Sequence, residues 1–256
     1  MSEKVHKSNV VSYYDEHAKF KIRDYLNVNP RVHEAWQTLI RNTPFTPNRI
    51  LEVGCGIGSI CAKMNKKWPN ATITGMDIST QSIAIATKLF ANKNVNFIES
   101  QLKEDVFNEK FDLIVFMDVY EHIAVFDRAV VHASLKKLLN NKGIIFLSVP
   151  TPHNLKWSLK HKPETMQPVD EHISFEVINK LANDTDTEVQ LYQKKSIWNT
   201  GDYAHIVLEK NDDFEAAFFV NKPISFFERA KRIFRKTKNQ FTKPIRRFRV
   251  NKKLNT

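Results

Sequence analysis

The chain has few of the features that mark secreted or membrane-spanning proteins. Its 256 residues include two cysteines, too few for a disulfide framework or a four-ligand zinc site, so we expect a reducing compartment. No apolar run approaches the ~18–20 residues that a membrane-spanning helix needs. The first 20 residues, MSEKVHKSNVVSYYDEHAKF, lack the apolar core of a signal peptide. These absences predict a cytoplasmic globular protein.

Acidic residues are scarce in the last part of the chain. From Lys222 to Thr256 there are 13 Lys and Arg residues against one acid, Glu228. The formal net charge of the whole chain is +11, so the first 221 residues are close to neutral. The isoelectric point of about 9.5 therefore reflects the tail and says nothing about a site in the body.

Glycine is also rare, but three of the six glycines alternate in the segment Gly54-Cys55-Gly56-Ile57-Gly58, directly after the apolar run ILEV. Alternating glycines let the backbone turn sharply and approach a ligand closely. The spacing differs from the GxGxxG of dinucleotide-binding loops and from a P-loop. Glu52, just before the loop, also disfavours an anionic ligand. The alternative is a strand-to-helix turn that merely needs glycine.

The order of apolar patterns predicts an α/β protein. Between residues 49 and 150, strand patterns such as ATITGMD, FDLIVFMD and GIIFLSVP alternate with helical ones, which indicates parallel strands. After Pro150 we expect a loop, a helix at SFEVINKLAND, and an antiparallel hairpin formed by EVQLYQKKSIW and YAHIVLEK. We therefore divide the chain into a helical cover (1–48), an α/β domain (49–210) and a basic extension (211–256).

The acid Asp77 ends the second predicted strand, 25 positions after Glu52. A carboxylate at this place can accept hydrogen bonds from both ribose hydroxyls of a nucleoside. The alternative is a role in starting the next helix, because Ser79 and Thr80 follow. Together with the glycine loop, ribose binding is the better interpretation.

The segments ILEVGCGIG, GMDIS, FDLIVFMDVYEHI and GIIFLSVP resemble, in order and spacing, the signature segments of class I S-adenosylmethionine-dependent methyltransferases. The similarity spans about residues 49–210 and is closest to the group containing ubiquinone-biosynthesis O-methyltransferases and sugar or small-molecule methylases. It implies a Rossmann-like, doubly wound sheet with S-adenosylmethionine as cofactor. It also implies that the cofactor is bound by Glu52, Gly54, Cys55, Gly56, Gly58, Asp77, Ile78, Gln101, Leu102, Met117 and Asp118. Gln101 departs from the family, which commonly has an acid near the adenine.

The polar cluster Asp118-Val119-Tyr120-Glu121-His122 follows the fourth strand, where open α/β sheets bind ligands. Glu121 could orient His122 or complement the next helix, and we weigh these roles equally. The resemblance favours a function for Glu121 and His122, with His122 as a candidate general base. A structural hydrogen-bonding role for this histidine is the alternative.

Further candidates lie outside the glycine loop and the fourth strand. The resemblance suggests that His172, in Asp170-Glu171-His172, belongs to a loop covering the acceptor, and His172 is the second candidate for the general base after His122. A helix-capping segment is the alternative. His153 follows the last parallel strand and could face the acceptor. Tyr14 resembles an aromatic position on an N-terminal helix that folds over the cofactor. No set of residues has convincing metal-ligand spacing, so we predict no metal.

The tail has apolar residues at Phe226, Phe227, Ala230, Ile233, Phe234, Phe241, Ile245 and Phe248, mostly three or four positions apart. This spacing predicts an amphipathic basic helix, which Pro244 would break or kink. An anionic membrane surface fits both faces of the helix. Nucleic acid and the groove of a protein partner are the other interpretations.

These features predict an enzyme that transfers a methyl group to an acceptor heteroatom. The preferred acceptor is a hydroxyl of a small-molecule or lipid-linked substrate, such as a glycan intermediate or a prenylated ring, and the protein would then lie at the inner face of the membrane. The alternatives are an RNA methyltransferase with the tail as an electrostatic clamp, and a non-catalytic scaffold that keeps cofactor binding.

Overall fold

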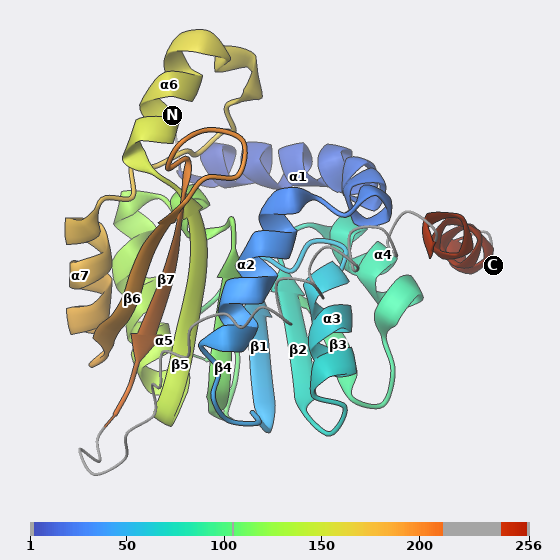
Figure 1. The fold of residues 1–256 in the computed structure, drawn as a ribbon, viewed down its shortest axis with the longest axis horizontal. Helices are drawn as coiled ribbons and strands as arrows, with labels where there is room; N and C mark the ends of the chain where they lie inside the picture. Colours follow the sequence, from blue (N-terminus) through green and yellow to red (C-terminus); the bar gives the residue numbers. More distant parts are fainter. Residues whose placement is uncertain (1–2, 104, 212–241, 255–256) are drawn as a thin grey trace, which may run out of the picture.

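The computed structural model of the chain describes residues 3–103, 105–211 and 242–254. Its centre is a seven-stranded sheet in the order β3-β2-β1-β4-β5-β7-β6 (Figure 1). The strands are β1 (Arg49–Val53), β2 (Thr72–Asp77), β3 (Val95–Glu99), β4 (Phe111–Met117), β5 (Leu139–Pro150), β6 (Glu188–Lys195) and β7 (Tyr203–Glu209). β1 to β5 are parallel, and β7 is antiparallel to both β5 and β6. The predicted fold, a mostly parallel sheet closed by an antiparallel hairpin, is confirmed.

Helices flank this sheet on both faces. The α-helices are α1 (Glu3–Asn27), α2 (Pro30–Arg41), α3 (Ser59–Lys67), α4 (Thr80–Phe90), α5 (Arg128–Leu138), α6 (Pro152–His161) and α7 (Phe175–Asp184). Three short 3₁₀ turns are η1 (Tyr120–His122), η2 (Val125–Asp127) and η3 (Pro163–Thr165). Within the described ranges, no helix is both long and apolar enough to cross a bilayer.

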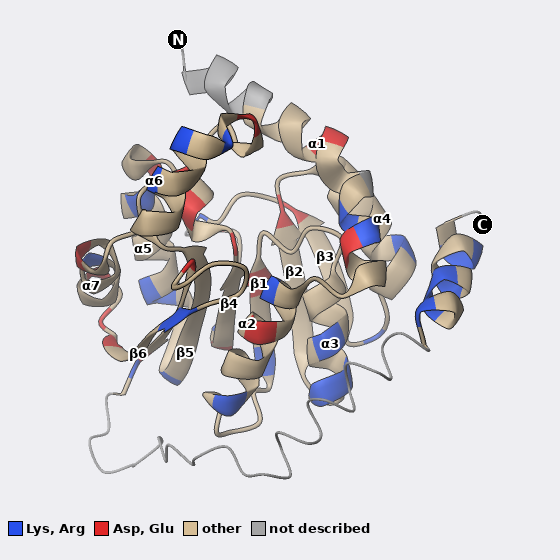
Figure 2. Ribbon diagram, turned by 45° about the horizontal axis from the view of Figure 1, so that its top comes forward, with Lys and Arg blue, Asp and Glu red and all other residues tan. Residues whose placement is uncertain are grey.

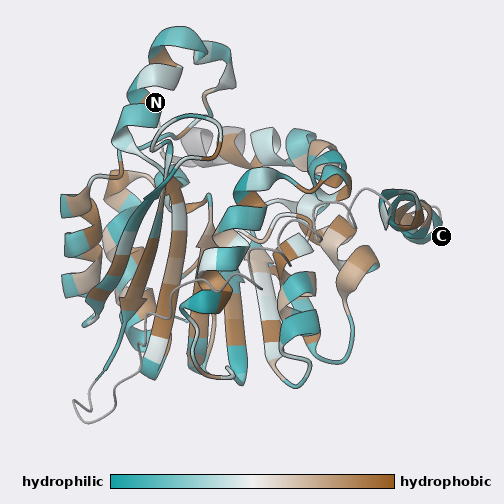
Figure 3. Cartoon of the chain, viewed as in Figure 1, coloured by the Kyte–Doolittle hydropathy of each residue, from teal (hydrophilic) through white to brown (hydrophobic). Residues whose placement is uncertain are grey.

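The apolar core consists of two layers, one on each face of the sheet. One layer packs α5 and α7 against the sheet, and the other packs α2 and α3 against the opposite face. The central strands are apolar over nearly their whole length because both of their faces are covered (Figure 3). Thr38 of α2 contacts the buried His205 of β7 at 2.7 Å and ties this helix to the sheet.

The long helix α1 lies across the carboxyl ends of the parallel strands (Figure 1). Asp15 of α1 accepts hydrogen bonds from the Ser79 hydroxyl (2.6 Å) and the Gln81 N–H (3.1 Å) at the start of α4. This contact holds α1 over the end of β2 and makes it the roof of the cavity described below.

The segment after Pro150 is a helix, α6, where the sequence predicted a loop. Thr151 is its N-cap and accepts a hydrogen bond from the N–H of Asn154, and Pro152 occupies the first helical position. Threonine followed by proline is a helix-start signal, because proline at this position needs no hydrogen-bond partner for its nitrogen. The expected helix at 174–184 is present as α7.

The tail contains a helix at residues 242–254, which includes Pro244. The predicted break or kink at Pro244 depends on the segment before residue 242, which lies outside the described residues, so it stays a prediction. The remaining predicted positions, from Phe226 to Phe241, lie outside the described residues.

Candidate active site

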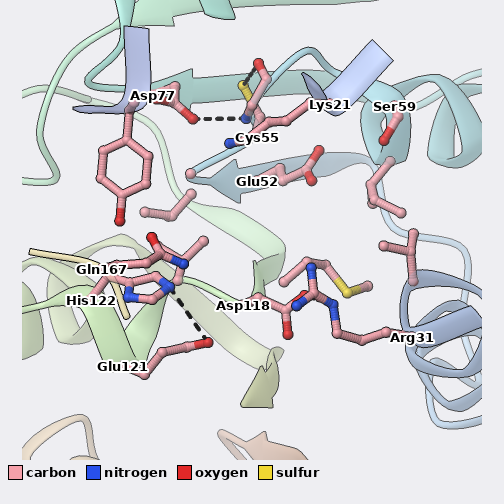
Figure 4. A pocket seen from close by; sticks show the side chains of 18 of the residues that line it. Lys21, Arg31, Glu52, Cys55, Ser59, Asp77, Asp118, Glu121, His122 and Gln167 are labelled. Atoms are coloured by element: carbon pink, nitrogen blue, oxygen red, sulfur yellow. Dashed lines mark hydrogen bonds and ion pairs between the residues drawn. The ribbon is translucent and has the colours of Figure 1, made fainter. Parts of the chain in front are cut away.

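A cavity of about 1410 Å³ lies at the carboxyl ends of β1, β2 and β4. Residues of α1 and α2, including Lys21 and Arg31, line it together with the segments after β1, β2 and β4 (Figure 4). Open α/β sheets bind their ligands in this position, because the strand order reverses there and leaves a crevice. Most of the residues singled out from the sequence meet in this cavity.

The glycine loop after β1 forms one wall. Gly54 and Gly56 line the cavity and have positive φ angles of 68° and 53°. A Cβ atom on Gly54 would lie 2.4 Å from the side chain of Val119, so only glycine fits this turn. Asp77 holds the loop in place, because its Oδ2 accepts a hydrogen bond of 2.7 Å from the Gly56 N–H. The backbone thus comes close to any ligand in the cavity.

Gly58 differs from the other two loop glycines. It does not line the cavity, and its φ of 78° makes it the left-handed N-cap of α3. A Cβ there would lie 2.6 Å from the ring of Phe97 and 3.2 Å from Ala86. Gly58 therefore allows α3 to pack closely on its neighbours, and the structure brings it to a packing position instead of the ligand surface.

Glu52 is a buried carboxyl group at the base of the cavity, with only 2% of its surface exposed. Burial raises the pKa of Glu52 to about 7, although the Cys61 thiol donates a hydrogen bond of 2.8 Å to Oε2. The thiols of Cys55 and Cys61 have pKa values raised well above the usual range, also mainly by burial. A cationic ligand would therefore stabilise the ionised form of Glu52. The two cysteines stay protonated and are unreactive.

The end of β2 and the segment after β3 supply the next part of the wall. Asp77 and Ile78 line the cavity, and so do Gln101 and Leu102. Besides the Gly56 N–H, Asp77 accepts the Ser79 N–H at 2.9 Å, and each of its oxygens can accept a further bond. The carboxylate of Asp77 can bind a ribose, and the amide of Gln101 with the neighbouring apolar side chain of Leu102 can bind a purine.

Asp118 follows β4 with a positive φ of 59° and lines the cavity beside Met117. Its Oδ2 lies 2.8 Å from Nε of Arg31, which comes from the first turn of α2. Arg31 also donates a hydrogen bond of 2.9 Å to the hydroxyl of Tyr203. Burial raises the pKa of Asp118, and Arg31 opposes this rise. Asp118 thus lies in a charged network that spans α2, β4 and β7.

Glu121 and His122 lie in η1 and face the same cavity (Figure 4). His122 Nδ1 donates to the carbonyl oxygen of Val169 at 2.7 Å and lies 3.1 Å from Oδ1 of Asp170. His122 Nε2 lies 3.8 Å from Oε1 of Glu121. The ring is therefore held from its Nδ1 side, and Nε2 is left to act on a ligand.

The charges around His122 set its proton affinity. Burial disfavours the protonated ring, but Glu121 and the contacts to Asp170 and Val169 outweigh it and raise the pKa of His122 above 6.5. Burial also raises the pKa of Glu121 to about 7. Glu121 Oε2 is buried and has no hydrogen-bond partner within the described part of the chain. In this part of the cavity His122 can accept a proton, and Glu121 Oε2 can accept a hydrogen bond from a polar group of a ligand.

The turn η1, which carries His122, is held in place by a contact between Tyr120 and a second histidine, His132. Tyr120 is fully buried, and its hydroxyl lies 2.8 Å from Nε2 of His132 in α5. Nδ1 of His132 lies 2.6 Å from Oδ2 of Asp184 at the end of α7. A neutral His132 can donate to Asp184 and accept from Tyr120. No local sequence pattern indicates this support, because Tyr120, His132 and Asp184 are far apart along the chain.

The cover helix α1 contributes Tyr14 and Lys21 to the cavity. The rings of Tyr14 and His122 have centroids 6.3 Å apart in an edge-on arrangement. The Nζ of Lys21 lies 5.6 Å from the Tyr14 ring centroid, and a Cβ on Gly56 would be 3.0 Å from this amine. Sequence reasoning found Tyr14 but missed Lys21 and Arg31. For Arg31, the helix-start pair Asn29-Pro30 was an available signal.

Two candidate histidines do not reach this cavity. His172 is exposed, because its neighbour Ile173 points into the core and side chains alternate along this extended segment. His153 is exposed in the first turn of α6 and lines a separate shallow pocket with Phe175 and Tyr192. Among the described residues, no group of three or more His, Cys, Asp or Glu side chains is arranged to hold a metal ion.

A methyltransferase domain family model matches residues 23–188, which is more than half of the chain. The chain belongs to this methyltransferase family. The match confirms the prediction of a class I S-adenosylmethionine-dependent methyltransferase with S-adenosylmethionine as its cofactor.

Curated relatives share part of this sequence. The ubiquinone biosynthesis O-methyltransferase of Pasteurella multocida is 29% identical over 161 residues, which cover 58% of this chain and 63% of that protein. The malonyl-[acyl-carrier protein] O-methyltransferase of Acetivibrio thermocellus is 38% identical over 66 residues, or 26% of this chain and 23% of that one. The matches thus span less than two thirds of these relatives.

Solved structures share the fold at low sequence identity. The magnesium protoporphyrin IX methyltransferase from Synechocystis PCC 6803, with bound S-adenosylhomocysteine (SAH), has a TM-score of 0.59 and 17% identity and covers 80% of this chain and 100% of its own. The N-methyltransferase NodS from Bradyrhizobium japonicum, also with SAH, has a TM-score of 0.61, 14% identity and the same coverage.

The residues of the cavity fit this cofactor. S-adenosylmethionine carries a cationic sulfonium and an ammonium group, and the cavity contains the buried carboxyl groups of Glu52 and Asp77 and the partly buried one of Asp118. Its carboxylate matches the amine of Lys21, which lies against the glycine loop. The open backbone at Gly56 leaves room for close approach.

Proposed function

We propose that this methyltransferase acts on a hydroxyl group of a small-molecule or lipid-linked acceptor, with His122 as the general base. The observation that carries the proposal is the arrangement of the His122 ring, whose Nδ1 is held by the Val169 carbonyl (2.7 Å) and Asp170 (3.1 Å). A hydroxyl is a weak nucleophile, so removing its proton adds roughly 10²–10⁴-fold to the rate.

Cofactor binding falls to the opposite side of the cavity. When bound, S-adenosylmethionine supplies a methyl group on a positively charged sulfur. Asp77 would bind the ribose hydroxyls, Gln101 and Leu102 would contact the adenine, and Glu52 would face the cationic methionine portion. The backbone at Gly54 and Gly56 would line the cavity next to the cofactor.

The chain's own residues then handle the proton and the geometry. His122 Nε2 would accept the acceptor's hydroxyl proton while the oxygen bonds to the methyl carbon and the methyl–sulfur bond breaks, which leaves neutral SAH. Asp170 and Glu121 would stabilise the resulting imidazolium. Tyr14 in the roof excludes water from this corner. Holding the two substrates in line supplies much of the remaining acceleration, up to ~7–11 kcal/mol.

The lining beyond His122 supports an acceptor with an apolar body and a polar group. The cavity lining includes the apolar side chains of Ile123, Ala124, Val131, Leu155 and Met166. Gln167 Oε1 and Glu121 Oε2 are buried there without a hydrogen-bond partner among the described residues, so they can bind polar groups of an acceptor. The ubiquinone biosynthesis relatives point in the same direction, toward a prenylated ring.

A carboxyl acceptor is the second candidate. The malonyl-[acyl-carrier protein] O-methyltransferase relatives suggest it, and Arg31 places a guanidinium in the cavity that could pair with a carboxylate. A carboxylate is already ionised at neutral pH and needs no base, so this candidate predicts little dependence of the rate on His122.

The acceptor can be identified by incubating extracts with methyl-labelled S-adenosylmethionine and locating the label by mass spectrometry. On that acceptor, His122→Ala should lower kcat by ~10²–10⁴ and leave SAH affinity nearly intact. The exposed His172→Ala is the matched control and should keep wild-type turnover. Wild-type kcat should rise with pH through the raised pKa of His122, since the base must be neutral. Unchanged turnover in His122→Ala on a hydroxyl acceptor would refute the proposed base.

A further inference from the structure

The helix at residues 242–254, called the tail helix below, is fixed to the body by one face. Val250 is buried, with 5% of its surface exposed. Arg246 donates a hydrogen bond of 3.4 Å to the carbonyl oxygen of Leu26, and Lys253 donates one of 2.5 Å to that of Leu89. Leu26 and Leu89 lie in the last turns of α1 and α4, where carbonyl groups lack helical partners and attract cations. These contacts set which face of the tail helix points away from the body.

The outward face has an apolar centre. Phe248 is 70% exposed and Ile245 is 55% exposed, which makes Phe248 one of the most exposed large apolar side chains described. Phe248 lies two residues from Val250, and at about 100° per residue the two side chains point to nearly opposite sides of the helix. The apolar ring is therefore exposed because the helix is docked by its other face.

Cations flank this apolar centre. Arg247, Arg249 and Lys252 are exposed, and the tail helix contains no acidic residue (Figure 2). Across the whole segment from residue 222 to 256 the charge is +12, with one acid. An exposed aromatic ring within a ring of cations matches the boundary of an anionic bilayer, where apolar side chains enter and basic side chains meet lipid phosphates.

We propose that the tail helix docks the enzyme on an anionic phospholipid surface. Phe248 and Ile245 enter the boundary between headgroups and acyl chains, while Arg247 and Lys252 bind the phosphates. The docked face, at Val250, keeps its contacts with the body, so the catalytic domain is held at the surface in one orientation. This inference does not depend on which acceptor the enzyme methylates.

Vesicle binding by the full-length protein tests the insertion directly. Cys55 and Cys61 are both buried, so an Ile245→Cys variant can be labelled selectively with an environment-sensitive fluorophore. With phosphatidylcholine vesicles containing phosphatidylglycerol, we expect a blue shift and brightening of this label, and none with pure phosphatidylcholine. The same label at Lys194→Cys, on β6, should not respond.

Two further variants separate charge from apolar contact. Each Lys or Arg near an anionic surface strengthens binding about fivefold, so Arg247→Gln with Lys252→Gln should weaken vesicle binding about 25-fold at low salt. Lys110→Gln with Lys194→Gln removes the same charge from exposed body positions and is the matched control. Phe248→Ser should abolish the binding that survives about 1 M salt, where exposed charges are screened beyond ~3 Å.

Two outcomes would overturn the proposal. In one, the labelled tail helix ignores anionic vesicles while the protein still binds SAH. In the other, the Arg247/Lys252 and body-control variants lose vesicle affinity equally. The face would instead be assigned to nucleic acid if the wild-type protein binds single-stranded RNA and does not respond to vesicles. In that case the Arg247/Lys252 variant should lose RNA binding. Phe248→Ser should leave SAH affinity unchanged in every case, which shows that the variant is folded.

Discussion

The buried Glu52 offers a test of how the cofactor site is constructed. Burial raises the pKa of Glu52 to about 7 from 4.5, and at about 1.4 kcal/mol per pH unit its ionisation costs the folded protein about 3 kcal/mol. A raised carboxyl pKa contributes stability below pH ~4.5 that is lost as the pH rises through 7. Glu52→Gln removes this titration and keeps an acceptor for the Cys61 thiol.

The expected result is a pH-dependent gain in stability. Without cofactor, Glu52→Gln and wild type should have similar melting temperatures at pH 5. At pH 8 the variant should be more stable by up to about 3 kcal/mol, or roughly 6–12 °C in Tm for a chain of this size. Other buried acids titrate equally in both proteins, so the difference between the two isolates Glu52.

The same substitution should weaken cofactor binding. An ionised hydrogen-bonding group contributes about 1.5–3 kcal/mol, so S-adenosylmethionine affinity should fall by ~10–150-fold at pH 8. Thermal melts at both pH values and calorimetric titration measure the two effects. A variant that is equally destabilised at pH 5 and pH 8, or one with unchanged cofactor affinity, would show that Glu52 is not an acid held for a cationic ligand.

Three further predictions concern the loop and its supports. Asp77→Ala should weaken SAH binding by about 1–3 kcal/mol, as measured by calorimetry, and unchanged affinity would remove Asp77 from the cofactor site. Gly58→Ala should lower the free energy of unfolding by more than Gly201→Ala. Both glycines have positive φ, but a Cβ on Gly201 would meet nothing closer than 3.9 Å. If both variants lose the same free energy of unfolding, the close contacts of a Cβ at Gly58 have no effect on stability. Tyr120→Phe leaves His132 Nε2 without its partner and should cost about 1–3 kcal/mol in denaturant unfolding, whereas a neutral result would contradict the anchoring role.

The sheet was predictable from the sequence because its signals are local. Each central strand is a short apolar run, and turn residues separate it from the next helix, as at Gly54 and at Ser79. The hairpin at Asn199–Asp202 also follows a local pattern. Its aspartate accepts the N–H groups of Ile197, Trp198 and Asn199, which fixes the turn. α6 was missed only because Thr151-Pro152 was interpreted as a loop.

The part of the cavity built from the strand ends was also largely predictable. Glu52 and Asp77 lie in the last residues of β1 and β2, His122 lies in η1 after β4, and all three line the cavity. The part built from the cover helices was not predictable, because Lys21 and Arg31 come from α1 and α2, whose docking depends on tertiary contacts. Arg31, for example, reaches the cavity because α2 packs on β7, and nothing near it in the sequence indicates Asp118 or Tyr203 as partners.

The concentration of acids in this cavity explains why the strongly basic net charge says little about the chemistry. Glu52, Asp77, Asp118 and Glu121 line one cavity, and burial raises the pKa of three of them, Glu52, Asp118 and Glu121. Desolvated carboxyl groups this close together are costly to ionise without a cation. A sulfonium-bearing cofactor relieves that cost, and its demethylated product, which has no charge at sulfur, relieves less of it. The site should therefore favour the methyl donor over the spent cofactor, whereas the basic tail acts elsewhere.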